Sequence, residues 1–153
     1  MEELDPSLKI LYEFYHRRWW CYRQLFFRFK CKHTLLNALA LITVCIGMVI
    51  GPLFECGIAT TCLTAFGAFI KSWTDFKNFA TKVDMCRFAY TTYDKILTFI
   101  HLESLCKSST EEWEKTLIKS QTLDDTIVEL TPIVTDDIFQ TYEKNYKSKE
   151  TKV

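Results

Sequence analysis

The 153-residue sequence predicts an all-α protein, and three observations lead to this fold class. Only 4 Gly and 3 Pro occur, which is few for a chain with many turns. Apolar side chains recur every three or four residues over long stretches, as they do on one face of a helix. No segment is rich in alternating β-branched residues. The length suits a single domain, and apolar residues, at 48%, suffice to bury a core.

The charges are unevenly distributed, although the formal net charge is zero. Residues 1–34 carry 7 basic and 4 acidic residues, and residues 35–70 carry only Glu55. Residues 71–107 carry 6 basic and 4 acidic residues, and residues 108–153 carry 6 and 10. The zero balance argues against a strongly basic nucleic-acid-binding protein and against a highly charged disordered chain, so no nucleic-acid partner is expected.

The first expected element is an amphipathic cytoplasmic helix within residues 1–33. We expect its apolar face to pack on another helix, with Arg18 close to that face. The alternative is a helix that lies on an anionic membrane surface, because basic and aromatic residues crowd toward its C-terminal end. The apolar face consists of Leu4, Leu8, Leu11, Tyr15, Trp19, Tyr22, Phe26 and Phe29.

A two-helix transmembrane hairpin is predicted for residues 34–73. Residues 35–54 form a stretch of 20 residues without a charge, about the length that a helix needs to cross the hydrocarbon core of a bilayer. Residues 51–57 are expected to form the turn, and the uncharged run 58–70 starts the return helix. The alternative is a buried helical hairpin inside a soluble bundle, but a soluble helix of this length normally shows a polar stripe.

Basic residues flank this hairpin on both sides and are missing from its turn, which predicts that both termini are cytoplasmic. The long charged segment ahead of the apolar run differs from a signal peptide. The sequence therefore predicts an integral membrane protein with the lipid bilayer as its partner. Residues expected to anchor it at the membrane interface are Trp19, Trp20, Arg28, Lys30, Lys32, Lys71 and Trp73.

Small residues of the hairpin are expected at contacts between helices. All four glycines lie in this region, and the first two form a GxxxG motif, which lets two backbones approach closely in lipid. Close packing within one hairpin and assembly of several copies both fit this pattern, and we expect a homo-oligomer. The glycines are Gly47, Gly51, Gly57 and Gly67, and a neighbouring polar face, suited to interhelical hydrogen bonds or to a pore lining, holds Thr60, Thr61 and Thr64.

Residues 74–107 are expected to continue the second hairpin helix without a break, because neither Gly nor Pro occurs between Gly67 and Pro132. This continuation is predicted to pack on residues 1–33 as an antiparallel stalk. The predicted contact face consists of Trp73, Phe76, Ala80, Val83, Arg87, Tyr90, Asp94, Leu97, Ile100 and Ser104, with Arg87 and Asp94 as a polar pair of the stalk.

Residues 108–147 are predicted to form short acidic helices, which are the expected binding place for a cytoplasmic protein partner. Residues 109–112 and 122–125 resemble capping boxes, and each is expected to start a helix. Thr135 is expected to cap the last helix. Residues 148–153 are predicted to be a disordered tail.

No signature of catalysis stands out. The sequence lacks the HExxH, P-loop and GxSxG motifs and a glycine-rich dinucleotide turn. The three histidines are far apart, and the seven cysteines include no CxxC pair. We therefore expect no catalytic, cofactor-binding or metal-binding residues, and a protein that is not an enzyme.

The order of these parts resembles the SLATT group of small membrane proteins, which have an N-terminal helix, a tight two-helix membrane hairpin and a long cytoplasmic helix. The resemblance implies a membrane effector that acts by forming pores, often under nucleotide-signalled immune systems. It carries over no catalytic residues, and it implies an activating signal from a partner or from assembly. Within residues 8–146 the likeness rests on YEFYHRRWWCYRQLFFRFK, the hairpin, KSWTDFKNFATKVDMCRFAYTTYDKIL and LDDTIVELTPIVTDDIFQTYEKNY.

Two functions therefore compete at the level of sequence. The first is a small oligomeric integral-membrane effector of SLATT-like type that forms a pore or channel. The second is a non-conducting membrane anchor or adaptor that recruits a cytoplasmic partner through residues 108–147. The oligomeric state in detergent separates these two functions.

Overall fold

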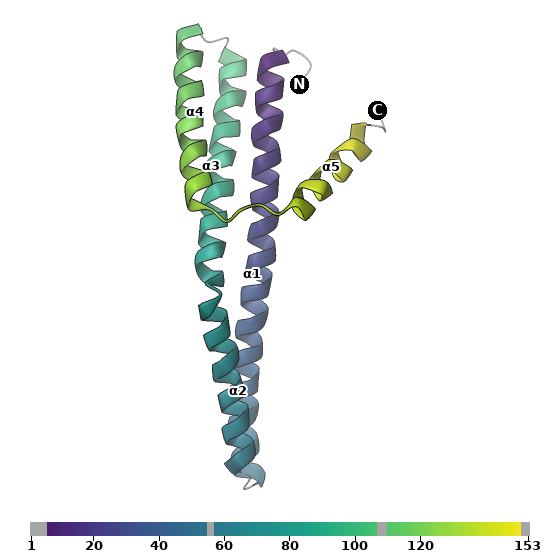
Figure 1. The fold of residues 1–153 in the computed structure, drawn as a ribbon, viewed down its shortest axis with the longest axis vertical. Coiled ribbons are helices and arrows are strands. Elements are labelled where there is room, and N and C mark those ends of the chain that lie inside the picture. The colour runs from purple at the N-terminus through teal and green to yellow at the C-terminus, as the bar shows by residue number, and fades with distance from the viewer. Residues whose placement is uncertain (1–5, 55–56, 107–109, 151–153) are drawn as a thin grey trace. The chain divides into compact units, whose positions relative to one another are not determined.

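A computed structural model describes residues 6–54, 57–106 and 110–150, and these residues form five α-helices and no strand (Figure 1). The predicted all-α class is confirmed for this part of the chain. The helices are α1 (Pro6–Phe54), α2 (Gly57–Phe76), α3 (Phe79–Cys106), α4 (Thr110–Leu130) and α5 (Asp136–Glu150).

The chain divides into two compact units. Residues 27–83 form one, which we call the hairpin unit, and residues 1–26 together with 84–153 form the other, which we call the bundle unit. The division differs from the expected hairpin boundaries at residues 34 and 73, because the helices α1 and α3 each contribute to both units.

Close approach of two glycines to the facing helix defines the packing of the hairpin unit. A Cβ atom on Gly47 would lie 3.2 Å from the Leu63 Cβ. A Cβ atom on Gly67 would lie 2.7 Å from a Val44 methyl carbon and 3.1 Å from the carbonyl oxygen of Ala40. Residues later in α1 thus meet residues earlier in α2, so the two helices run antiparallel, and they approach each other closely at these two glycines.

The helices of the hairpin extend into the expected turn 51–57. Helix α1 includes Gly51 and Pro52 and ends at Phe54, and α2 begins at Gly57, with residues 55–56 between them outside the described structure. Proline removes one backbone donor and crowds the carbonyl four residues earlier, and α1 ends two residues after it. A Cβ atom on Gly57 would meet nothing within 4 Å, so this glycine takes no part in helix packing.

Helices α2 and α3 are separated by a break, so the uninterrupted continuation expected for residues 74–107 is corrected. Asn78 has a φ of 50°, in the left-handed region that asparagine tolerates better than most residues. Its N–H donates to the carbonyl of Asp75 at 2.9 Å, and its own carbonyl accepts from Lys82 at 3.0 Å. One helix therefore ends and the next begins without any Gly or Pro.

The buried face of α3 differs from the predicted contact face. Helical spacing counted from Trp73 without a break placed Arg87 and Asp94 on the contact face, yet both side chains are exposed. Trp73 and Phe76, ahead of the break, are exposed as well, and along much of α3 the buried face lies one position earlier than predicted. Its members include Cys86, Ala89, Tyr93, Ile96, Leu97 and Ile100.

The core of the bundle unit lies between α3, α4 and the N-terminal part of α1, which run side by side (Figure 1). Ring contacts pair Tyr22 with Tyr93 and Phe26 with Tyr90, so α1 and α3 are antiparallel. Helix α5 adds Ile138 to the core. The remaining buried apolar residues of α1, α4 and α5 are Tyr15, Cys21, Leu25, Ile127 and Tyr142.

The C-terminal helices are longer than the sequence suggested. Helix α4 is a single helix of 21 residues, so the second start expected at residues 122–125 is wrong. The Thr122 hydroxyl donates to the carbonyl of Ile118 at 2.9 Å, which accommodates threonine inside a helix.

Helix α5 begins next to the expected cap. The Thr135 carbonyl accepts the N–H of Ile138 at 3.0 Å, and Asp136 and Asp137 occupy the first turn, where the helix dipole favours negative charge. The Thr135 hydroxyl bonds the Asp137 carboxylate. Residues 148–150, expected in the disordered tail, belong to this helix, and residues 151–153 lie outside the described structure.

We predict that Asn78→Val lowers the free energy of unfolding by about 1–2 kcal/mol, because a β-branched side chain is strained at positive φ. Asn78→Gly should leave the stability unchanged or raise it slightly. Thermal unfolding followed by circular dichroism in detergent measures both. Equal stability of the two variants would contradict the left-handed conformation.

Candidate functional site

A charged cluster joins three helices of the bundle unit. Arg18 of α1 donates through Nη1 to both carboxylate oxygens of Asp124 on α4, at 2.6 Å for Oδ2. The Tyr93 hydroxyl of α3 donates to Oδ1 of the same carboxylate at 2.6 Å. The Arg18 side chain is 30% exposed and the Asp124 side chain 15%, so water reaches this pair poorly. One carboxylate therefore holds α1, α3 and α4 together.

The protonation states of this cluster are fixed by its surroundings. Burial raises the pKa of Tyr93, and the adjacent Asp124 carboxylate raises it further, so the phenol stays a neutral donor. Burial acts against the Arg18 charge, but bonds to Tyr93 and Asp124 outweigh it and raise the pKa of Arg18. The guanidinium also lies 4.5 Å from the ring centroid of Phe14. The cluster is neutral as a whole, which suits a structural role.

Aromatic and hydroxyl groups extend the cluster toward the end of α4. The rings of Tyr22 and Tyr93 stack with centroids 5.7 Å apart. The hydroxyl oxygens of Tyr22 and Thr131 are 2.8 Å apart, and the Thr131 hydroxyl is also 2.6 Å from the carbonyl oxygen of Ile127. These contacts fix the C-terminal end of α4 on α1.

Helix α5 is held on α1 by aromatic contacts and one ion pair. The Tyr142 ring packs on Trp20 with centroids 5.4 Å apart, and its hydroxyl lies 3.4 Å from Nδ1 of His16. Arg17 pairs with Glu143 at 2.9 Å, but the two side chains are 41% and 50% exposed, so the pair contributes little stability.

The residues expected at the membrane interface fall into two groups. Trp19 and Trp20 are half-buried in the bundle unit, where Trp19 lies 5.4 Å from the His16 ring. Contacts within the protein therefore account for the partial burial of both indole rings. In the hairpin unit, Lys71 pairs with Asp75 at 3.0 Å. The exposed members of this set are Arg28, Lys30, Lys32, Lys71 and Trp73.

Two threonines of the predicted polar face of α2, Thr61 and Thr64, bond through their hydroxyls to their own helix. The Thr61 hydroxyl donates to the Gly57 carbonyl at 2.9 Å. The Thr64 hydroxyl lies 2.6 Å from the Thr60 carbonyl oxygen. These two hydroxyls are satisfied without water, so they do not by themselves indicate a hydrated pore.

One described helix, α1 within Leu8–Ile50, is long and apolar enough to cross a membrane by length and composition. Only 11% of its most apolar window is buried, whereas the core helix of a soluble protein is mostly buried. Near the N-terminus such a helix alone is weak evidence for a membrane span, because a signal sequence meets the same test.

The expected stalk pair does not form, and the pair that exists was not predicted. Arg87 and Asp94 are both exposed, and no bond between them occurs among the described contacts. The only sequence sign of the real cluster was the position of Arg18 beside the apolar face of the first helix. Its partner Asp124 is 106 residues away along the chain.

No group of three or more His, Cys, Asp or Glu that could hold a metal ion occurs among the described residues.

No family model, curated protein or solved structure matches this chain. The similarity to the SLATT group therefore remains a prediction from the sequence alone.

We predict that Arg18→Met lowers the free energy of unfolding by roughly 1–3 kcal/mol, because it leaves the buried Asp124 carboxylate without its cation. Adding Asp124→Leu should recover part of this loss, since no unpaired charge then remains. Chemical unfolding of both single variants and the double variant measures the coupling.

Arg17→Met is the matched control, because its ion pair is largely exposed, and it should cost less than about 1 kcal/mol. Additive losses in the double variant would contradict the assigned coupling of Arg18 and Asp124.

Proposed function

We propose that the chain is an integral membrane protein whose hairpin unit crosses the bilayer twice and carries the bundle unit on the cytoplasmic side. The outward surface of the hairpin unit supports this proposal, because large apolar side chains cover it and exposed patches of this kind are uncommon on soluble proteins. They are Leu35, Leu39, Leu41, Ile42, Ile46, Met48, Val49, Ile58, Phe66 and Phe69.

Helix α2 suits the second crossing. The helix has 20 residues, about 30 Å in length, and its uncharged run 58–70 accounts for about 20 Å of this. The Lys71 stem can extend along the apolar surface to bring its ammonium to the interface. Lys71 and Asp75 neutralise each other near its C-terminal end. The ring of Trp73 stacks on Phe69, and the Lys77 ammonium lies 4.9 Å from the same indole centroid, an arrangement that fits the lipid headgroup region.

The hydroxyl groups of the hairpin also suit a lipid environment. In lipid, each polar group must find its partner within the protein. The Thr43 hydroxyl donates to the Leu39 carbonyl at 2.8 Å, and Thr61 and Thr64 bond back in the same way. Basic residues precede α1's apolar part and follow that of α2, which supports cytoplasmic termini.

We predict that a glycosylation acceptor, placed in a Gly/Ser spacer inserted between residues 55 and 56, is modified when the chain is made in a eukaryotic membrane system. The acceptor would then lie on the lumenal side. The same acceptor appended after Val153 is the control and should stay unmodified. Gel mobility before and after glycosidase treatment reports both.

The protein should also stay with membranes after an alkaline wash. Release by this wash, or modification of the C-terminal acceptor, would overturn the proposed topology.

Self-association into a SLATT-like pore-forming effector is the second candidate, and one observation favours it. The side-chain oxygen of Asn37 is buried and has no hydrogen-bond partner, while its nitrogen lies 3.0 Å from Nε2 of His33. Asn37 lines a shallow groove of about 510 Å³ on the hairpin unit, together with Ala40, Gly67 and Ala68. An asparagine among small residues promotes association of membrane helices, because a neighbouring chain can supply the missing donor.

We predict that Asn37→Leu weakens self-association in detergent by about 1 kcal/mol per contact, a shift measurable by analytical ultracentrifugation. Thr61→Leu is the control, because this exposed hydroxyl bonds its own helix. Gly47→Leu is unsuitable, since Gly47 contacts Leu63 within the same chain.

Ion leakage from liposomes then separates the functions. Leakage that falls with Asn37→Leu supports the effector, whereas an oligomer that does not leak supports the anchor. A monomeric wild-type chain would remove the second candidate and leave the proposed membrane topology intact.

A further inference from the structure

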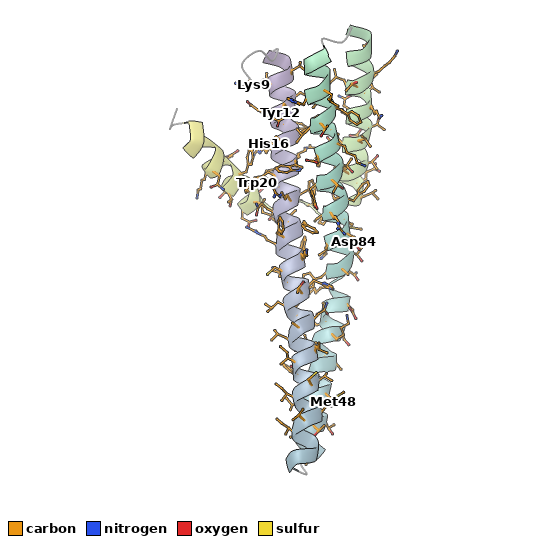
Figure 2. The ribbon with its side chains drawn as sticks, turned by 180° about the vertical axis from the view of Figure 1, so that it is seen from behind. Lys9, Tyr12, His16, Trp20, Met48 and Asp84 are labelled. Carbon is orange, nitrogen blue, oxygen red and sulfur yellow. The ribbon has the colours of Figure 1, made fainter. Side chains whose placement is uncertain are left out.

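We propose that a cleft in the bundle unit binds a small aromatic organic anion. The cleft lies between α1 and α3 and has a volume of about 420 Å³, within the range of sites for small molecules. The residues that carry the argument are Lys9, Tyr12, His16, Trp19, Leu97 and His101. Figure 2 shows Lys9, Tyr12 and His16 in succession along α1.

The middle of the cleft suits the flat apolar part of a ligand. Ile100 and Leu97, which are 1% and 8% exposed, give it an apolar floor. The Tyr12 and His16 rings stack with centroids 5.9 Å apart, and the Trp19 ring follows at 5.4 Å from His16. Burial lowers the pKa of His16, so the imidazole is mainly neutral at pH 7. These three rings on the α1 side of the cleft are themselves uncharged, with the Arg23 guanidinium 5.0 Å from the Trp19 ring centroid. They favour stacking against an aromatic ligand.

The two ends of the cleft differ in charge. Because α1 and α3 are antiparallel, Lys9 and His101 lie at one end, and Trp19 and Asp94 lie at the other. The ends are about 15 Å apart along the helix axis, from the helical rise over the residues between Lys9 and Trp19. The Lys9 ammonium attracts an anionic group, and the Asp94 carboxylate repels one. The cleft thus orients a ligand with its carboxylate, sulfonate or phosphate toward Lys9.

A compact ligand fits this cleft better than a helix of a second chain. Among the described lining residues, the Lys9 ammonium and the Asp94 carboxylate lie at opposite ends of a short apolar floor, which defines a site of limited length. The proposal concerns the bundle unit alone and does not depend on whether the hairpin unit conducts ions.

The test uses the full chain in detergent with 2-naphthalenesulfonate as the probe, titrated by calorimetry against a detergent blank. We expect saturable binding at one site per chain. Lys9→Gln should weaken this binding about tenfold, the scale of one charge-assisted hydrogen bond. Lys95→Gln, an exposed lysine of α3 outside the cleft lining, is the control and should bind as the wild type does.

A second pair of variants tests the cleft itself. Thr98→Trp fills it from the exposed side of α3 and should abolish binding. Thr126→Trp, at an equally exposed threonine that also bonds its own helix, should have no effect. Unchanged helix content in circular dichroism shows that both variants fold. If either variant does not fold, the affinity of Lys9→Gln for the probe tests the proposal instead.

Three results would overturn the proposal. They are no saturable binding by the wild type, equal affinity of Lys9→Gln and Lys95→Gln, and equal or tighter binding of the cationic probe 2-naphthylmethylamine. A change of oligomeric state in Thr98→Trp with unaltered probe binding would assign the cleft to contact between chains instead.

Discussion

The carboxylate of Asp124 is the interaction on which the bundle unit depends. It accepts hydrogen bonds from Arg18 of α1 and Tyr93 of α3, so a single side chain of α4 fixes the positions of two other helices. Apolar contacts alone tolerate sliding of one helix along another, whereas a fully bonded polar set is satisfied at one register only. The ring of Tyr22 stacks on Tyr93 beside this set, with centroids 5.7 Å apart. The bonds to the Asp124 carboxylate therefore both stabilise the bundle unit and set the register of its helices.

The hairpin unit is built differently, because the hydroxyls of Thr43, Thr61 and Thr64 bond within their own helices, and the buried oxygen of Asn37 is left without a partner. Threonine hydroxyls bond the carbonyls of their own turn, and the two helices meet at Gly47 and Gly67. Contact of this kind relies on close packing and needs no water-driven burial of apolar side chains. The large apolar residues are left to point outward. The bundle unit thus has an apolar core with one partly buried ion pair beside it, and the hairpin unit has an apolar exterior.

Much of the fold could be predicted from the sequence, because helical periodicity and the spacing of charges are local properties. The break at Asn78 could not, since the prediction relied on Gly and Pro as helix breakers and overlooked the tolerance of asparagine for positive φ. The predicted contact face was also wrong on both sides of this break, because Trp73 and Phe76 are exposed ahead of it and Arg87 and Asp94 are exposed after it. The pair of Arg18 and Asp124 has no local signature, because their contact depends on how three helices pack.

Conduction and anchoring make different demands on the hairpin unit. Anchoring requires an outward apolar surface, which a single chain already presents. Conduction requires a polar path, and Thr61 and Thr64 do not offer one within a single chain because their hydroxyls are bonded internally. Such a path must arise between chains, and the unpaired oxygen of Asn37 is the group that gains most from assembly. Any channel activity would therefore be a property of the oligomer, whereas the proposed membrane attachment requires only a single chain.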